Sequence, residues 1–334
     1  MASRRNFLAL PLAAALPLPA VRTAQAQAAT VMRLSHQYPP SHHIAGVLTR
    51  FAEEVKARSN GAVDVQVFPA EQLAKVAENF PGVARGAFEA AVATNFTWGN
   101  TIPEMSAQTI PFFFGDLEKN RRFPASEARK FLDGVTARRA VRSVAWLFTT
   151  NRAIFTSQRR PLVALEDFRG MKIRGINSLI DTALTAAGAA PAATPAPEVV
   201  GALQSGVLDA GLTDVSAAVS RRFYEVQKYG TVSPFFAVST QVYVNPRWWD
   251  RLPADGRGVI EAALAKAETE AVEVTVRTAD AAVGELREKG MTVHEQTPEQ
   301  VAAWQAVMQK PVMDAFLKSA PESGPRLLDL LRAV

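Results

Sequence analysis

The chain of 334 residues contains no cysteine. This absence excludes a disulfide framework, thiolate metal sites, a cysteine nucleophile and a lipid-modified N-terminal cysteine. Catalytic signatures are missing as well, because the sequence has neither a Gly-x-Ser-x-Gly elbow nor a His-Glu-x-x-His pair. An exported hydrolase or lyase would need a nucleophile beside a base, or a paired acid and base, so these absences argue against that class of protein.

Histidine is also scarce, with four residues in the whole chain. His42 and His43 are adjacent, whereas metal-binding helices place their histidines four residues apart, so the sequence predicts no zinc site and identifies no metal ligands. The stretches "GVARG" and "SGVLDAG" lack the Gly-x-Gly-x-x-Gly spacing, and we interpret them as turns rather than phosphate loops. We expect no cofactor.

The first 26 residues have the pattern of an export signal. "SRRNFLAL" contains the twin arginines Arg4 and Arg5, a short apolar stretch broken by prolines follows, and "AQA" ending at Ala26 is a small-x-small cleavage site. We therefore expect a twin-arginine signal peptide at residues 1–26, cleaved near Ala26, and a mature protein in the periplasm. An ordinary secretory signal is the alternative. No later apolar run approaches the length of a membrane span.

The charge of the chain argues against one further class of protein. The sequence has 37 Lys and Arg residues against 32 Asp and Glu residues, and loss of three arginines with the signal lowers the formal net charge from +5 to +2. Charges of both signs are mixed along the remaining chain, which is not the footprint of a nucleic-acid-binding protein.

The rest of the chain alternates between strand and helix patterns, which predicts an α/β fold. Strands are expected at residues 30–37, 62–69, 89–95, 141–157, 171–176 and 241–253, the last ending in a turn, and helices at residues 43–61, 76–88 and 178–189. The βα pattern occurs twice over roughly three hundred residues, so two similar lobes are expected. Residues 254–289 contain no proline and predict one helix of about 45 Å, long enough to run across both lobes.

One short strand raises a question of its own. In "FRGMKIRGINS" the basic residues Lys172 and Arg174 alternate with Met171 and Ile173, so strand geometry places the two basic side chains on the same side. An arginine there suits two-pronged recognition of a carboxylate or phosphate. A surface ion pair is the alternative interpretation, and the strand pattern alone does not separate the two.

Seven motifs in a fixed order carry a family resemblance: "LSHQYPPSHH", "VFPAEQLA", "IPFFFGDLE", "LEDFRGMKIRG", "LQSGVLDAG", "RRFYEVQKY" and "VNPRWWDRLP". With them, nearly all of the mature chain resembles the solute-binding proteins of tripartite ATP-independent periplasmic (TRAP) transporters, the DctP-like family. The resemblance implies two α/β lobes that close over one small organic acid, a long helix that ties the lobes together, and no catalysis. It implies lobe I at residues 27–150 plus 240–275 and lobe II at residues 151–239 plus 276–334.

The resemblance also assigns binding residues. The carboxylate-binding arginine of the family falls on Arg174, and a second family arginine falls on Arg152, which stands one residue further from Thr156 than usual. A shift by one residue turns a strand side chain to the other face unless a bulge absorbs it. Thr213 occupies the place of a family asparagine and Asp214 that of a proline. We expect Asp214 to pair with a basic residue or to cap the next helix.

Further pocket candidates follow from strand ends and from aromatic residues. Ligands in such folds bind beyond the carboxyl ends of strands, which favours the following polar residues: His36, Gln37, Thr94, Asn95 and, at the start of a helix, Gln72. Phe235 and Phe236 are candidates for a pocket wall, with a place in the core as the alternative.

The expected function is capture of a small carboxylate by Arg174 and hinge closure, followed by delivery to the small and large TRAP membrane subunits. The reduced polarity at residues 211–214 favours a monocarboxylate over sialic acid or four-carbon dicarboxylates. We expect a monomer that binds no nucleic acid. A periplasmic sensor subunit that binds the same ligand remains an alternative, because the sequence of the binding protein does not separate transport from sensing.

Overall fold

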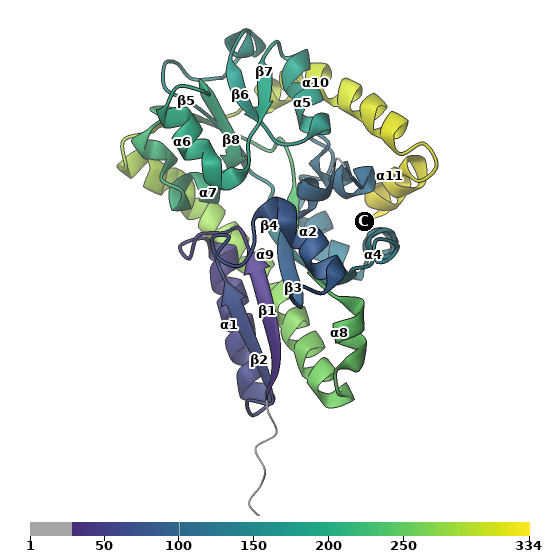
Figure 1. Ribbon diagram of the computed structural model, residues 1–334. Helices are drawn as coiled ribbons and strands as arrows, with labels where there is room; N and C mark the ends of the chain where they lie inside the picture. Colours follow the sequence, from purple (N-terminus) through teal and green to yellow (C-terminus); the bar gives the residue numbers. More distant parts are fainter. Residues whose placement is uncertain (1–28, 100) are drawn as a thin grey trace, which may run out of the picture.

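The computed structural model describes residues 29–99 and 101–334, so the predicted signal peptide at residues 1–26 lies outside the described residues. The described chain forms a mixed α/β fold with two separate sheets, one of five strands and one of six. Figure 1 shows the five-stranded sheet in the lower half of the view and the six-stranded sheet in the upper half. This arrangement gives the molecule two lobes, as the alternating pattern predicted.

The first sheet contains, in spatial order, β2 (Val63–Phe68), β1 (Thr30–His36), β3 (Ala90–Thr94), β10 (Val238–Val244) and β4 (Arg142–Thr150). β1 is parallel to both of its neighbours, whereas β10 is antiparallel to β3 and β4. Apolar residues of β1 and β2 are buried in one core cluster with those of helix α1 (His43–Arg58). Because β1 and β3 are parallel, the residues that follow them, including Gln37, lie at the same edge of the sheet as Thr94.

The second sheet contains, in spatial order, β11 (Thr292–Glu295), β9 (Tyr229–Ser233), β5 (Ala153–Ser157), β8 (Ala210–Asp214), β6 (Lys172–Gly175) and β7 (Ala190–Ala193). The helices that follow its strands are α5 (Ser178–Ala186), α6 (Val199–Gln204) and α7 (Val215–Ser220). β6 is parallel to β8, so Arg174 near the end of β6 and Thr213 near the end of β8 share one edge of this sheet.

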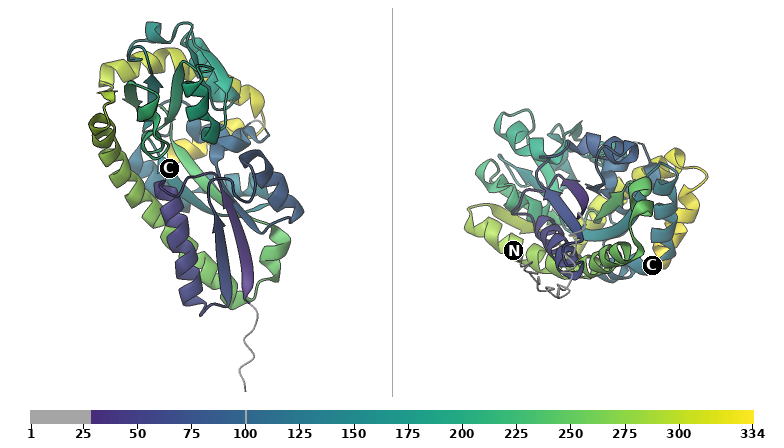
Figure 2. Two further views of the ribbon diagram at one scale, coloured as in Figure 1. Left: turned by 60° about the vertical axis from the view of Figure 1, so that its left-hand side comes forward. Right: turned by 60° about the horizontal axis from the view of Figure 1, so that its bottom comes forward.

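Two short segments and one long helix join the sheets. β4 leads to β5 through residues 151–152, and β9 leads to β10 through residues 234–237. Helix α9 (Ala254–Glu288) packs against α1 and β4 beside the first sheet and against α7 and β11 beside the second, and Figure 2 shows it running along one side of the molecule. Its 35 residues correspond to about 52 Å. The predicted helix across both lobes is therefore confirmed.

The remaining helices are α2 (Val76–Arg85), α3 (Leu117–Arg122), α4 (Glu127–Ala137), α8 (Pro246–Arg251), α10 (Pro298–Ser319) and α11 (Gly324–Ala333). α10 packs on α5 beside the second sheet, and α11 returns to pack on α4. The turn predicted before residue 254 contains α8, because the Asn245 side chain caps it by accepting a hydrogen bond from the Trp248 N–H. Within residues 29–99 and 101–334, no helix combines the length and apolar character that a membrane span requires.

Candidate ligand-binding site

A cavity opens where the carboxyl-end edges of the two sheets face each other. It encloses about 430 Å³ of space not filled by protein atoms, part of it open to solvent. Its polar lining includes Tyr38, His42, Thr94, Arg174, Thr213 and Asp214, and its apolar lining includes Phe96, Ile176, Phe236 and Val238. Because both sheets contribute, the cavity lies between the lobes and its shape depends on how far they close.

Arg174 brings a buried positive charge into this cavity. Its side chain is 4% exposed, and its guanidinium donates from Nε to the Thr194 carbonyl (3.1 Å) and from Nη1 to the Leu212 carbonyl (2.7 Å). No carboxylate of the described chain lies within 4.0 Å of it. Burial, and next the neighbouring Arg221, lower the pKa of Arg174 to about 10, while Asp214 acts in the opposite direction. The guanidinium is thus fixed in place by main-chain carbonyls, and no carboxylate of the described residues contacts it directly.

Arg221 is a second arginine in the cavity lining, and it reaches across to the first lobe. It follows α7, and its Nη2 donates to the main-chain carbonyl of Gln37 (3.1 Å) after β1. Burial lowers the pKa of Arg221 despite the opposing influence of Asp214. Within the described residues, no carboxylate is within 4.0 Å of Arg221 either. The cavity therefore contains two arginines and one acidic side chain.

Asp214 is that acidic side chain, at the junction of β8 and α7. Its Oδ1 accepts the Ala217 N–H (2.7 Å) and caps α7, and its Oδ2 lies 3.9 Å from His42 Nε2. Burial acts to raise the pKa of Asp214, but His42, His43 and the hydrogen bond from Ala217 outweigh it, so the pKa is below its usual value and the carboxyl group is ionised at neutral pH. The structure thus combines both roles expected of Asp214, the helix cap and a basic neighbour.

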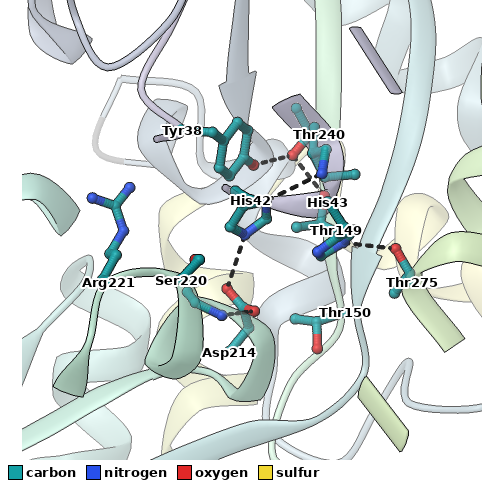
Figure 3. A network of polar contacts seen from close by, with 12 residues as sticks. Tyr38, His42, His43, Thr149, Thr150, Asp214, Ser220, Arg221, Thr240 and Thr275 are labelled. Atoms are coloured by element: carbon teal, nitrogen blue, oxygen red, sulfur yellow. Dashed lines mark hydrogen bonds and ion pairs between the residues drawn. The ribbon is translucent and has the colours of Figure 1, made fainter. Parts of the chain in front are cut away.

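His42 faces Asp214 from the start of α1, in the other lobe. The ring is 2% exposed and stacks against Tyr38 and His43, with both pairs of ring centroids 4.4 Å apart. Its Nδ1 accepts the Ile44 N–H (3.2 Å), whereas its Nε2 has no hydrogen-bond partner. Figure 3 shows the ring of His42 between Tyr38 and the Asp214 carboxylate, with His43 on its other side toward Thr275.

The structure brings three of the predicted site residues together at the cavity: Arg174, Thr213 and Thr94. Asn95 is fully buried next to Thr94 in the sequence, but its amide donates to Gln108 Oε1 (3.2 Å) and it does not line the cavity. Gln37 lines the cavity, whereas His36 is buried and its Nδ1 accepts the Tyr38 N–H (3.2 Å).

Three other predicted residues lie away from the cavity lining. Arg152 is in the crossing segment after β4 rather than in a strand, and its guanidinium pairs with Asp280 on α9 (3.2 Å) with 39% of the side chain exposed. Gln72 is exposed at the surface. Phe235 is completely buried and packs edge to face with Phe155, so it belongs to the core, while its neighbour Phe236 lines the cavity.

Sequence reasoning missed Tyr38, His42 and Arg221 as members of the lining. All three lie in motifs that carry the family resemblance, "LSHQYPPSHH" and "RRFYEVQKY". His42 was weighed only as a possible metal ligand, and the described residues contain no group of three or more His, Asp or Glu side chains able to hold a metal ion. The available signal was the place of these residues in two family motifs, one from each lobe.

Comparisons with known proteins test the family resemblance. A C4-dicarboxylate-binding periplasmic protein DctP of Rhodobacter capsulatus is 32% identical over 317 residues, covering 94% of each chain. The crystal structure of an extracytoplasmic solute receptor of Bordetella pertussis that binds pyroglutamic acid is 26% identical and has a TM-score of 0.84, covering 91% of this chain and 100% of that one.

A TRAP periplasmic solute-binding protein of Desulfovibrio salexigens, solved with bound orotic acid, is also 26% identical, with a TM-score of 0.85 and coverage of 91% and 97%. Residues 34–319 match the family described as DctP, bacterial extracellular solute-binding protein, family 7. The resemblance that the seven motifs predicted is therefore confirmed, and the chain belongs to the DctP family of TRAP solute-binding proteins.

Proposed function

We propose that this protein captures a small monocarboxylic acid between its lobes, with Arg174 as the anchor for the carboxylate. The observation that carries the proposal is the buried guanidinium of Arg174, which lines the cavity and has no acidic partner within 4.0 Å in the described chain. A desolvated cation needs compensation by charge and hydrogen bonds, and a bound carboxylate supplies both. Thr213 and Thr94 line the same cavity and offer hydroxyl groups to the ligand.

The charges of the lining favour one carboxylate rather than two. Arg174 and Arg221 contribute two positive charges, and the ionised Asp214 contributes one negative charge, which leaves an excess of one positive charge. A monocarboxylate neutralises that excess, whereas a dicarboxylate would leave a net negative charge in a largely desolvated space. Pyroglutamic and orotic acids, the ligands named for two relatives, are both ring compounds with one carboxyl group, whereas the relative of Rhodobacter capsulatus is named for C4-dicarboxylates. Apolar walls such as Phe236 and Val238 suit a small apolar or cyclic body.

Contacts between the lobes support a closing mechanism. Arg221 donates a hydrogen bond to the Gln37 carbonyl, and the Ser41 hydroxyl donates one to the Ser220 carbonyl (3.2 Å). The loop before α1 therefore contacts the end of α7. We propose that lobe I (residues 27–150 plus 240–275) and lobe II (residues 151–239 plus 276–334) open to admit the acid and close around it. The closed, monomeric protein then delivers the acid to the TRAP membrane subunits, without a cofactor and without catalysis.

A thermal-shift screen of small organic acids followed by calorimetry tests this function. A ligand at a hundred times its dissociation constant adds about 2.7 kcal/mol of stability, so a true ligand shifts the melting temperature clearly. We expect monocarboxylates to bind more tightly than succinate, malate or sialic acid. A four-carbon dicarboxylate as the tightest ligand would contradict the charge argument, and the absence of binding by any carboxylate would contradict the proposed function as a whole.

A further inference from the structure

His42 and Asp214 face each other across the cleft and are separated by a narrow gap. His42 caps the start of α1 in the first lobe and Asp214 ends β8 in the second, and their nearest polar atoms, Nε2 and Oδ2, are 3.9 Å apart. This distance is too long for a direct hydrogen bond. A single ligand atom can nevertheless lie within about 2.8 Å of both atoms at once. Both side chains line the cavity that contains Arg174.

The hydrogen-bonding role of each atom follows from its neighbours. His42 Nδ1 accepts the Ile44 N–H, so in the neutral ring the proton is on Nε2, which is a donor without a partner at 2% exposure of the residue. Stacking against Tyr38 on one side and His43 on the other holds the ring in this orientation. Asp214 Oδ1 is used by the cap of α7, so Oδ2 is the free acceptor. The gap therefore has a donor on one side and an anionic acceptor on the other.

The position of the gap relative to Arg174 determines which part of a ligand reaches it. The Arg174 guanidinium donates to the carbonyl of Leu212, and Asp214 follows two residues later on the same strand, so both side chains line the same part of the cavity. Asp214 acts electrostatically on Arg174, so the atoms next to an anchored carboxylate are the part of a ligand that can reach the gap. Arg221, which lines the same cavity, bounds this region beside α7.

We propose that His42 and Asp214 together select acids that carry a hydroxyl group on the carbon next to the carboxylate. This inference rests on the proposed function, because it takes Arg174 as the anchor of the carboxylate. A hydroxyl oxygen accepts from His42 Nε2–H and donates its proton to Asp214 Oδ2, so it satisfies both sides of the gap. An oxo group accepts from His42 but places a second acceptor against the carboxylate of Asp214. A methylene group satisfies neither side and leaves both polar groups buried without partners.

Matched acids with one carbon skeleton test the selection directly. Lactate, pyruvate and propionate form one series, and mandelate, phenylglyoxylate and phenylacetate form another with an aromatic body. Calorimetry on the purified mature protein should give at least about tenfold tighter binding of the hydroxy acid than of the oxo or unsubstituted acid, because the hydrogen bond to a charged group is lost in both. Equal affinities across a series that does bind would overturn the inference.

The substitution Asp214→Asn provides a sharper test because it replaces the hydrogen-bond acceptor on one side of the gap by a donor. Asparagine caps helices as well as aspartate does, so its Oδ1 keeps the bond from Ala217 and its Nδ2 donor replaces the Oδ2 acceptor. The preference for the hydroxy acid over the oxo acid should fall by at least about tenfold, or invert. Asp280→Asn, which removes the same charge from an exposed residue paired with Arg152, is the matched control and should leave the ratio unchanged.

Different results would contradict the proposed function and the role of His42 and Asp214. If both acids of a series bind and Arg174→Ala weakens both, but Asp214→Asn leaves their ratio unchanged, the role of His42 and Asp214 is wrong and the proposed function stands. If no monocarboxylate binds, or if binding does not depend on Arg174, the proposed function itself is wrong. Circular dichroism establishes that each variant is folded, and where Asp214→Asn does not fold, the ratio measured with the unaltered protein decides the question.

Discussion

Replacement of Arg174 by alanine is the perturbation with the largest expected effect on binding. The guanidinium is 4% exposed and is held by the carbonyls of Thr194 and Leu212, so its orientation is fixed before the ligand arrives. Within the described chain, no carboxylate within 4.0 Å competes with the ligand for it. Breaking a desolvated ion pair by removing one partner typically costs about 3–5 kcal/mol. At about 1.4 kcal/mol per decade, Arg174→Ala should weaken binding by roughly two to three orders of magnitude.

The unliganded protein should respond much less to the same change. Arg174→Ala removes two hydrogen bonds to main-chain carbonyls, but it also removes a desolvated positive charge close to Arg221, whose influence lowers the pKa of Arg174. These effects oppose each other, and the carbonyls can bond to water that enters the cavity. The free energy of unfolding in urea should therefore change by less than about 1.5 kcal/mol. Arg174→Lys should recover part of the affinity, because the charge remains and the planar fork is lost.

Calorimetry and urea denaturation on the same samples separate binding from folding. Arg152→Ala is the matched control, since Arg152 pairs with Asp280 on α9 and does not line the cavity. It should bind the ligand like the unaltered protein. If Arg174→Ala binds within a few-fold of the unaltered protein while folded, Arg174 is not the anchor. If it unfolds without ligand, the arginine has a structural role and the reasoning is refuted.

Three further predictions concern stability. Glu268→Ala should lower the free energy of unfolding by roughly 3 kcal/mol in urea titrations, because Glu268 accepts the buried Trp146 N–H (2.7 Å) and pairs with Arg129; a loss under 1 kcal/mol would contradict this. Burial lowers the pKa of His36 from 6.5 to about 4, so the unfolded chain takes up a proton on His36 at a higher pH than the folded protein does. Lowering the pH from 7 to 5 should therefore reduce the free energy of unfolding by about 2 kcal/mol. His36→Asn should reduce this loss of stability in acid. An unchanged dependence of stability on pH would refute the role of His36. Gly211→Ala should destabilise the fold by about 1–3 kcal/mol, since a Cβ there would lie 2.6 Å from Thr156 Oγ1; a neutral effect on the melting temperature would argue against this crowding.

Much of the first lobe and helix α9 could be predicted because these elements show a clear pattern, whereas the 22-residue helix α10 was not predicted. The strand "VDVQVF" alternates with period two, and the helix at residues 254–288 has neither proline nor a continuous polar stretch to end it. Short elements were missed for the opposite reason. β7 has the sequence "APAA" and α8 begins with "PRWW", so neither is long enough to have a period, and pairing with β6 or the Asn245 cap determines its structure.

The candidate site was predictable in part. Arg174 stands out because a basic residue within a buried strand needs a reason, and the family motif supplies one. Arg152 was expected from the match to a second family arginine, although it stands one residue further from Thr156 than usual. The chain leaves β4 at Thr150, and the Arg152 side chain pairs with Asp280 on α9. Apart from their place in the family motifs, His42 and Arg221 show no local pattern that indicates binding, because they become part of one cavity only when the lobes bring the start of α1 beside α7. Such cross-lobe contacts depend on tertiary structure rather than on periodicity.

A crystal structure of the protein with its tightest monocarboxylate bound tests the central claim most directly. The carboxylate should lie within about 2.7–3.1 Å of the Arg174 guanidinium, in the cavity between the two sheets, and its α-substituent should point to the gap between His42 and Asp214. A carboxylate bound by Arg152, or by any group that leaves Arg174 without an anionic partner, would contradict the role of Arg174 as the anchor.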